Sequence, residues 1–113
     1  MKAVVYEKYG SATVQFTEVE KPVPTDDQVL IRIRASSVNG PDRESVFGRV
    51  PYGSQPPPGK HIRMGGRRQV SRRILGSDIA GQVEAVGKDN TEFKLGDEVF
   101  GEVGGYSGGF ADY

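Results

Sequence analysis

Apolar and polar residues alternate along several short stretches of this chain, with the period of two that is typical of half-buried β-strands. The clearest stretch is residues 28–35. One face would carry Val29, Ile31, Ile33 and Ala35, and the other would carry Arg32 and Arg34. Weaker strand patterns cover residues 3–6, 13–17, 82–86, 93–101 and 110–113. The pattern therefore predicts a chain built mainly of short strands.

Glycine and proline support that interpretation. The chain of 113 residues contains 16 glycines and 7 prolines, and both residue types disfavour helix interiors. The hydrophobic share of 35% and mean hydropathy of -0.50 predict one domain with a small core. Within residues 39–44, Pro41 and the acids that follow it suit the first turn of a helix. We expect this helix to be short and to end by Gly48. We expect a mainly β fold, a barrel or a sandwich, with one or two short helices.

Residues 48–73 show no periodicity. Between Gly48 and Leu75 lie no acids and these basic residues: Arg49, Lys60, Arg63, Arg67, Arg68, Arg72 and Arg73. We expect a long basic loop, the least ordered part of the domain, contributing little to its stability. Such a loop could contact cofactor phosphates, an anionic substrate or RNA, but charge runs are more often simply solvated. His61, the single histidine, is expected to be one of its solvated residues.

Charge and cysteine content narrow the possible functions. The formal net charge is +0, and there is no nucleic-acid motif, so neither nucleic acid nor membrane is expected as a partner. Because Cys is 0, the chain can form neither a disulfide nor a thiolate metal site. The first residues contain no long apolar run, so we expect a cytoplasmic protein without a signal peptide.

Three motifs in order resemble the medium-chain dehydrogenase/reductase family. They are VLIRIRASSVN at 29–39, LGSDIAGQVEAVG at 75–87 and FKLGDEVF at 93–100. The chain looks most like the quinone oxidoreductase branch and is similar to zinc-free bacterial NAD(P)-dependent alcohol dehydrogenases. The resemblance implies a GroES-like, partly open β-barrel over residues 1–113. It also implies hydride transfer from NADPH to a quinone or an α,β-unsaturated carbonyl.

The same resemblance points to four candidate site residues. Zinc-dependent relatives place Cys where this chain has Asn39 and Gly-His-Glu where it has Gly76, Ser77 and Asp78. An amide, a hydroxyl and one carboxylate are a poor donor set for catalytic zinc, so we expect no metal. Asn39, Asp42, Ser77 and Asp78 are therefore expected to line a substrate or cofactor site, on one wall of a cleft.

Each candidate also has a structural alternative. Asn39 could instead satisfy backbone groups in its turn, and Asp78 could bond an arginine or the backbone. Asp42 and Glu44 could carry protons or orient a neighbour, or could be first-turn acids stabilised by the helix dipole. The structural interpretation is favoured for Glu44, and the sequence leaves the specific catalytic residue unknown.

The cofactor should be held mainly elsewhere. No series of strand, Gly-x-Gly-x-x-Gly and helix occurs, so we expect the Rossmann domain that binds NADPH to be absent from this chain. The chain would then be part of a longer enzyme, and the resemblance implies that this enzyme could form a homodimer. Alternatives are a stand-alone GroES-like binding module, such as a co-chaperonin subunit, and an assembly domain without redox activity.

Overall fold

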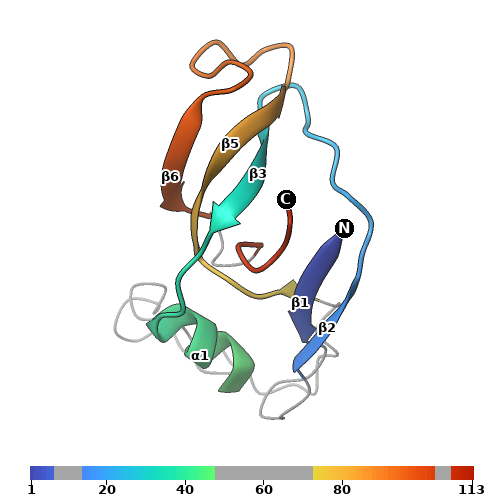
Figure 1. The fold of residues 1–113 in the computed structure, drawn as a ribbon, viewed down its shortest axis with the longest axis vertical. Helices are drawn as coiled ribbons and strands as arrows, with labels where there is room; N and C mark the ends of the chain where they lie inside the picture. The colour runs from blue at the N-terminus through green and yellow to red at the C-terminus, as the bar shows by residue number, and fades with distance from the viewer. Residues whose placement is uncertain (7–13, 48–72, 104–107) are drawn as a thin grey trace, which may run out of the picture.

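The computed structural model describes residues 1–6, 14–47, 73–103 and 108–113 (Figure 1). The expected basic loop at 48–73 therefore lies almost entirely outside the described residues, as does His61. The prediction that this loop is the least ordered part of the domain stays a prediction.

The described strands form two small antiparallel sheets. The first has the order β2-β1-β4 and contains β1 (Lys2–Tyr6), β2 (Val14–Glu18) and β4 (Arg73–Ile74). The second has the order β3-β5-β6 and contains β3 (Val29–Ala35), β5 (Asp78–Val86) and β6 (Glu98–Glu102). The helix α1 (Gly40–Phe47) follows β3 directly and lies at the end of the second sheet (Figure 1). The predicted mainly β class with a short helix is confirmed.

The C-terminal segment, residues 108–113, connects the two sheets. On one side, the Val4 N–H donates to the Phe110 carbonyl at 2.8 Å, and Ala3 forms an isolated bridge with Ala111. On the other side, the Ile33 N–H donates to the Asp112 carbonyl at 2.9 Å. One short segment thus bonds to both β1 and β3. The sheets are joined in this way but do not close, which agrees with a partly open barrel.

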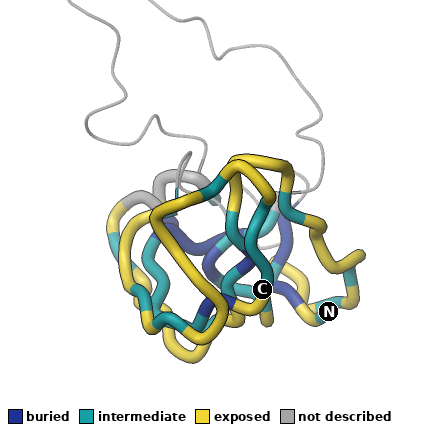
Figure 2. The backbone as a smooth tube through the Cα atoms, turned by 90° about the horizontal axis from the view of Figure 1, so that it is seen from above, coloured by how far each residue is buried: buried dark blue, intermediate teal, exposed yellow. Residues whose placement is uncertain are grey.

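The core is small, as the composition predicts. Its buried apolar residues are Ala3, Val5, Tyr6, Leu30, Leu75 and Val83. Tyr6 and Leu75 form a cluster against which Val4, Val46 and Phe110 pack, so α1 and the C-terminal segment share one apolar contact region with β1. In Figure 2 the buried residues lie in the centre of the body, with exposed segments around them. Within the described residues, no helix has the length and apolarity needed to cross a membrane.

The strand β3 departs from strict alternation. Arg32 and Arg34 are exposed as predicted, but Leu30, on the face predicted to be polar, is the most buried residue of the strand. The pairing with β5 shifts register between Leu30 and Ile31 and again between Ile33 and Ala35. A bulge changes the direction in which neighbouring side chains point, so two bulges disrupt a pattern of period two.

Candidate functional site

The end of β3 and the beginning of β5 meet beside α1. These strands are antiparallel, and Ala35 pairs with Ala80, so the residues that follow β3 must lie next to the residues that precede β5. The Ser36 hydroxyl donates to the Asp78 carbonyl at 2.5 Å and fastens the two segments. This pairing brings together two motifs that lie about forty positions apart in the sequence.

Asn39 occupies the turn between β3 and α1. Its carbonyl accepts from the Arg43 N–H at 3.5 Å, which places Asn39 at the N-cap position of the helix. Its side chain does not cap the helix but turns toward β5. There Nδ2 donates to Oδ2 of Asp78, and Oδ1 accepts from the Ser77 hydroxyl at 3.3 Å.

The carboxylate of Asp42 accepts hydrogen bonds from backbone N–H groups of the same region. Oδ2 accepts from the Asn39 N–H at 2.9 Å, the return bond of a capping box. Oδ1 accepts from the Gly76 N–H at 3.1 Å. The side chain is only 3% exposed, so this carboxylate is a buried link between the helix start and the segment before β5.

Asp78 and Ser77 complete the network. Oδ2 of Asp78 also accepts from the Ser37 hydroxyl at 2.7 Å. Ser77 is fully buried at 0% exposure, whereas Asn39 and Asp78 are partly exposed. Of the four candidates, Asn39 and Asp78 are thus the ones that a ligand could reach, and Asp42 and Ser77 support them. That the four line a substrate or cofactor site stays a prediction.

Sequence reasoning missed Ser36 and Ser37. Both follow β3 within the first motif and both bond to Asp78. The antiparallel pairing of the two motifs would have indicated them, because it places small polar residues after β3 against the start of β5. The side chain of Glu44 lies outside what the structure describes, so its predicted structural role stays a prediction.

The donors of the network do not fit a catalytic zinc ion. Catalytic zinc requires three protein ligands drawn from thiolate, imidazole and carboxylate. This site offers the Asp78 carboxylate and the buried Asp42 carboxylate, whose two oxygens already accept from backbone N–H groups. The carboxamide of Asn39 and the hydroxyl of Ser77 bond to each other, and the amide bonds to that carboxylate. Elsewhere in the described part of the chain, no group of three His, Cys, Asp or Glu residues is placed to hold a metal ion.

Two open grooves on the second sheet are lined by described residues, and both include Ile79, which directly follows Asp78. One, of about 400 Å³, runs along Val29, Ile31 and Ile79 to Phe93 and Phe100. The other, of about 200 Å³, is lined by residues that include Pro22, Ile33, Val103 and Tyr113. Neither of these two grooves includes any of the four candidates.

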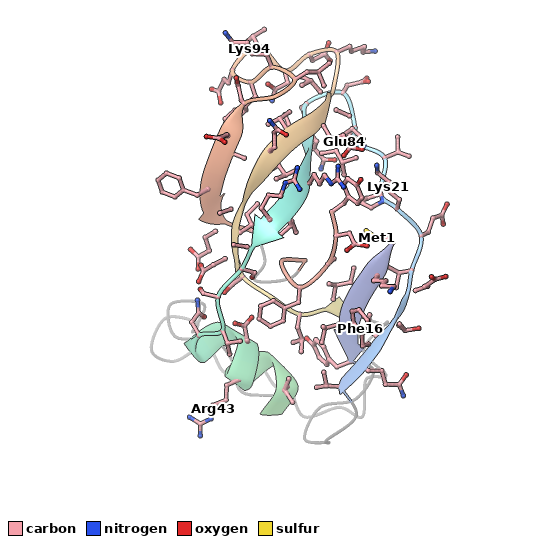
Figure 3. The ribbon with its side chains drawn as sticks, in the orientation of Figure 1. Met1, Phe16, Lys21, Arg43, Glu84 and Lys94 are labelled. Atoms are coloured by element: carbon pink, nitrogen blue, oxygen red, sulfur yellow. The ribbon has the colours of Figure 1, made fainter. Side chains whose placement is uncertain are left out.

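A second polar contact lies on the outer side of β5. The Lys21 ammonium approaches Oε1 of Glu84 at 2.6 Å (Figure 3). It also lies 3.6 Å from the centre of the Tyr113 ring. The hydrogen bond to Glu84 raises the pKa of Lys21, and the hydrogen bond from Lys21 lowers the pKa of Glu84. Both side chains are exposed, so this pair is a surface feature and not part of the candidate site.

Comparison with known proteins places this chain in a family. The sequence profile described as "Alcohol dehydrogenase GroES-like domain" matches residues 25–113. Human quinone oxidoreductase is 35% identical over 117 aligned positions, which cover 100% of this chain and 30% of that protein. The NADPH-dependent alkenal/one oxidoreductase of Arabidopsis thaliana chloroplasts is 33% identical and is covered over 24% of its length.

Solved structures agree with the sequence relatives. An alcohol dehydrogenase superfamily protein from Novosphingobium aromaticivorans superposes with a TM-score of 0.70 at 34% identity, over 94% of this chain and 28% of that one. This chain spans about 30% of the length of the human quinone oxidoreductase that it matches. The chain belongs to the alcohol dehydrogenase GroES-like domain family, within the medium-chain dehydrogenases/reductases that its three motifs resemble.

Proposed function

We propose that this chain is the substrate-side domain of an NAD(P)H-dependent oxidoreductase that transfers hydride to a quinone or an α,β-unsaturated carbonyl without zinc. The relatives named quinone oxidoreductase and alkenal/one oxidoreductase support the reaction class. The observation that carries the proposal is the bonded set of Asn39, Ser77 and Asp78. The family resemblance implies that these positions correspond to those where zinc-dependent relatives hold metal ligands.

A site without a metal must stabilise developing negative charge with hydrogen-bond donors. Asn39 is the partly exposed donor of the network, and its amide carries two N–H groups. Contacts to described residues use one of them, the bond to Asp78. The other N–H would bond to the carbonyl oxygen of the substrate or to a ribose hydroxyl of the cofactor.

The acceptor chemistry fits such a donor. When hydride adds to a quinone or an enone, charge develops on an oxygen conjugated with the reacting carbon, which amide donors can stabilise. Oxidation of a simple alcohol without a Lewis acid is harder, because the alcohol must lose a proton that zinc would have acidified. The nicotinamide, when bound, supplies the hydride. We propose that it is NADPH, held mainly by a Rossmann domain of the same protein.

Kinetics of the complete enzyme, meaning this chain together with its cofactor domain, test the proposal. NADPH oxidation is followed with 1,4-benzoquinone and with an enone as acceptors. Asn39→Ala should lower kcat about tenfold or more while changing the Kd for NADPH less than threefold. Asn90→Ala is the matched control, because within the described part of the chain the side chain of Asn90 bonds only to the backbone of its own turn and of Asp27. A complete enzyme that oxidises NADPH with neither acceptor would refute the proposal and favour a binding or assembly role.

A further inference from the structure

The amide of Asn39 is bonded at both ends, and the two bonds differ in what they specify. A hydroxyl can donate or accept, so Ser77 would tolerate either orientation of the amide. A carboxylate can only accept, so Asp78 requires that Nδ2, and not Oδ1, face it. Asp78 is therefore the residue that determines which way the amide of Asn39 points.

Asp78 is itself held by the end of β3. Ser37 donates to the same Oδ2 that accepts from Asn39, at 2.7 Å, and Ser36 donates to the Asp78 carbonyl at 2.5 Å. One bond fixes the side chain and the other fixes the backbone. The carboxylate is thus held in place before any ligand arrives, which is the condition for effective preorganisation.

The orientation of the amide has a chemical consequence. With Nδ2 next to Asp78, the second N–H of the amide lies on that same nitrogen and is available as a donor. If the amide were reversed, Oδ1 would face the carboxylate, and the group next to Asp78 would repel an approaching oxygen. The polarity of the site toward a ligand therefore depends on Asp78.

We infer that Asp78, held by Ser37, is a positioning residue that fixes Asn39 as a hydrogen-bond donor toward a carbonyl or hydroxyl oxygen of the ligand. This role rests on the proposed function for its ligand, but the orientation itself is a property of this chain. Ligands that offer an acceptor oxygen are selected, and analogues that present an N–H at the same place are rejected.

The orientation can be measured without catalysis, by nuclear magnetic resonance on the 113-residue chain with ¹⁵N-labelled asparagine. The chain has two asparagines, so Asn39→Asp assigns the Asn39 side-chain signals, and Asn90 reports on folding. The Asn39 amide protons should exchange with water slowly. In Asp78→Asn, whose amide can accept or donate, that exchange should accelerate roughly tenfold while the Asn90 signals stay in place.

Kinetics of the complete enzyme separate positioning from simple structural support. Asp78→Asn should lower kcat with 1,4-benzoquinone about tenfold while the KM for NADPH changes less than threefold. Asp78→Glu keeps an acceptor-only carboxylate and should recover part of the loss. Ser37→Ala should cost less than Asp78→Asn, because the bond from Asn39 to Asp78 remains. Asp97→Asn is the matched control, since among the described residues the side chain of Asp97 accepts only from the Lys94 N–H, in a distant turn.

Different results would overturn the two proposals. Unchanged exchange of the Asn39 amide protons in Asp78→Asn would overturn the positioning role, even in an active enzyme. Equal activity of the Asp78→Asn and Asp78→Glu variants would also overturn it. An unaltered complete enzyme that is inactive with quinones and enones, yet shows the protected amide, would overturn the proposed function alone.

Discussion

Asp42 and Gly76 lie 34 positions apart in the sequence, yet the carboxylate of Asp42 accepts from the backbone N–H of Gly76 at 3.1 Å. The other carboxylate oxygen accepts from the Asn39 N–H at 2.9 Å. One side chain, 3% exposed, thus satisfies two backbone donors from separate segments. It holds together the two segments that carry the candidate site.

Removing this carboxylate should destabilise the fold. Asp42→Ala leaves two backbone N–H groups without their acceptor in a buried place, and we expect a loss of about 2–4 kcal/mol. The free energy of unfolding of Asp42→Asn should lie between those of Asp42→Ala and the unchanged chain, because its amide offers one acceptor oxygen in place of two. Urea unfolding of the chain measures both. As a control, Asp97→Ala should cost about 1 kcal/mol or less, since it removes one exposed bond to Lys94. Equal losses at Asp42 and Asp97 would contradict the linking role.

Gly76 should tolerate no side chain. Its φ is 99°, and a Cβ there would overlap the backbone nitrogen of Phe110 and the carbonyl carbon of Gly109. Gly76→Ala should therefore cost more than about 3 kcal/mol, because strain and steric overlap add. Gly96 isolates the cost of backbone strain, because its φ is also positive, at 88°, but nothing lies within 4 Å of the position that a Cβ would take. Gly96→Ala should cost about 1–2 kcal/mol by urea unfolding, and a similar value at Gly76 would refute the overlap.

Local patterns were sufficient for most of the strands. Residues 28–35, 13–17 and 82–86 carry their periodicity within a few positions, and the structure has strands at 29–35, 14–18 and 78–86. The helix after Asn39 follows from Pro41 and from Asp42, the acidic residue of its first turn. These signals are local, and tertiary contacts reinforce them rather than override them.

Contacts between distant segments could not be predicted in the same way. Residues 110–113 looked like the start of a strand, but in the structure the segment connects two sheets, with bonds to Lys2 and Val4 of β1 and to Ile33 of β3. No sequence pattern indicates that arrangement, because both partners are remote. The closeness of Asn39 and Asp78 was likewise implied by the family resemblance, not by spacing, and Ser37 was missed because its partner lies 41 positions away.

The Lys21–Glu84 pair predicts a pH dependence of stability. Because the pKa of Glu84 is lowered in the fold, its contribution is present above its unfolded pKa of about 4.3 and is lost as pH falls through the folded value. Because the pKa of Lys21 is raised, its contribution is present below about pH 10.4 and is lost as pH rises through the folded value.

Thermal unfolding of Glu84→Gln tests the pH range over which the Lys21–Glu84 pair stabilises the fold. The variant should melt slightly lower than the unchanged chain near pH 7, and the difference should disappear near pH 3 and shrink in 1 M salt. The effect should be small, because both side chains are exposed. A difference that persists at pH 3 would mean that Glu84 stabilises the fold through packing instead of charge.

Finally, the donor set predicts weak binding of zinc by this domain. Asp78 is the one partly exposed carboxylate of the network, the buried Asp42 carboxylate is bonded to two backbone N–H groups, and the chain has no cysteine to supply a thiolate. Calorimetric titration of the chain with Zn²⁺ should show no site with a Kd below about 1 μM. Asn39→Cys places a thiolate beside Asp78, at the position where zinc-dependent relatives have one, and should bind Zn²⁺ more tightly than the unchanged chain. A one-to-one, submicromolar site in the unchanged chain that Asp78→Asn abolishes would show that this network is a metal site, and the zinc-free mechanism would then be wrong.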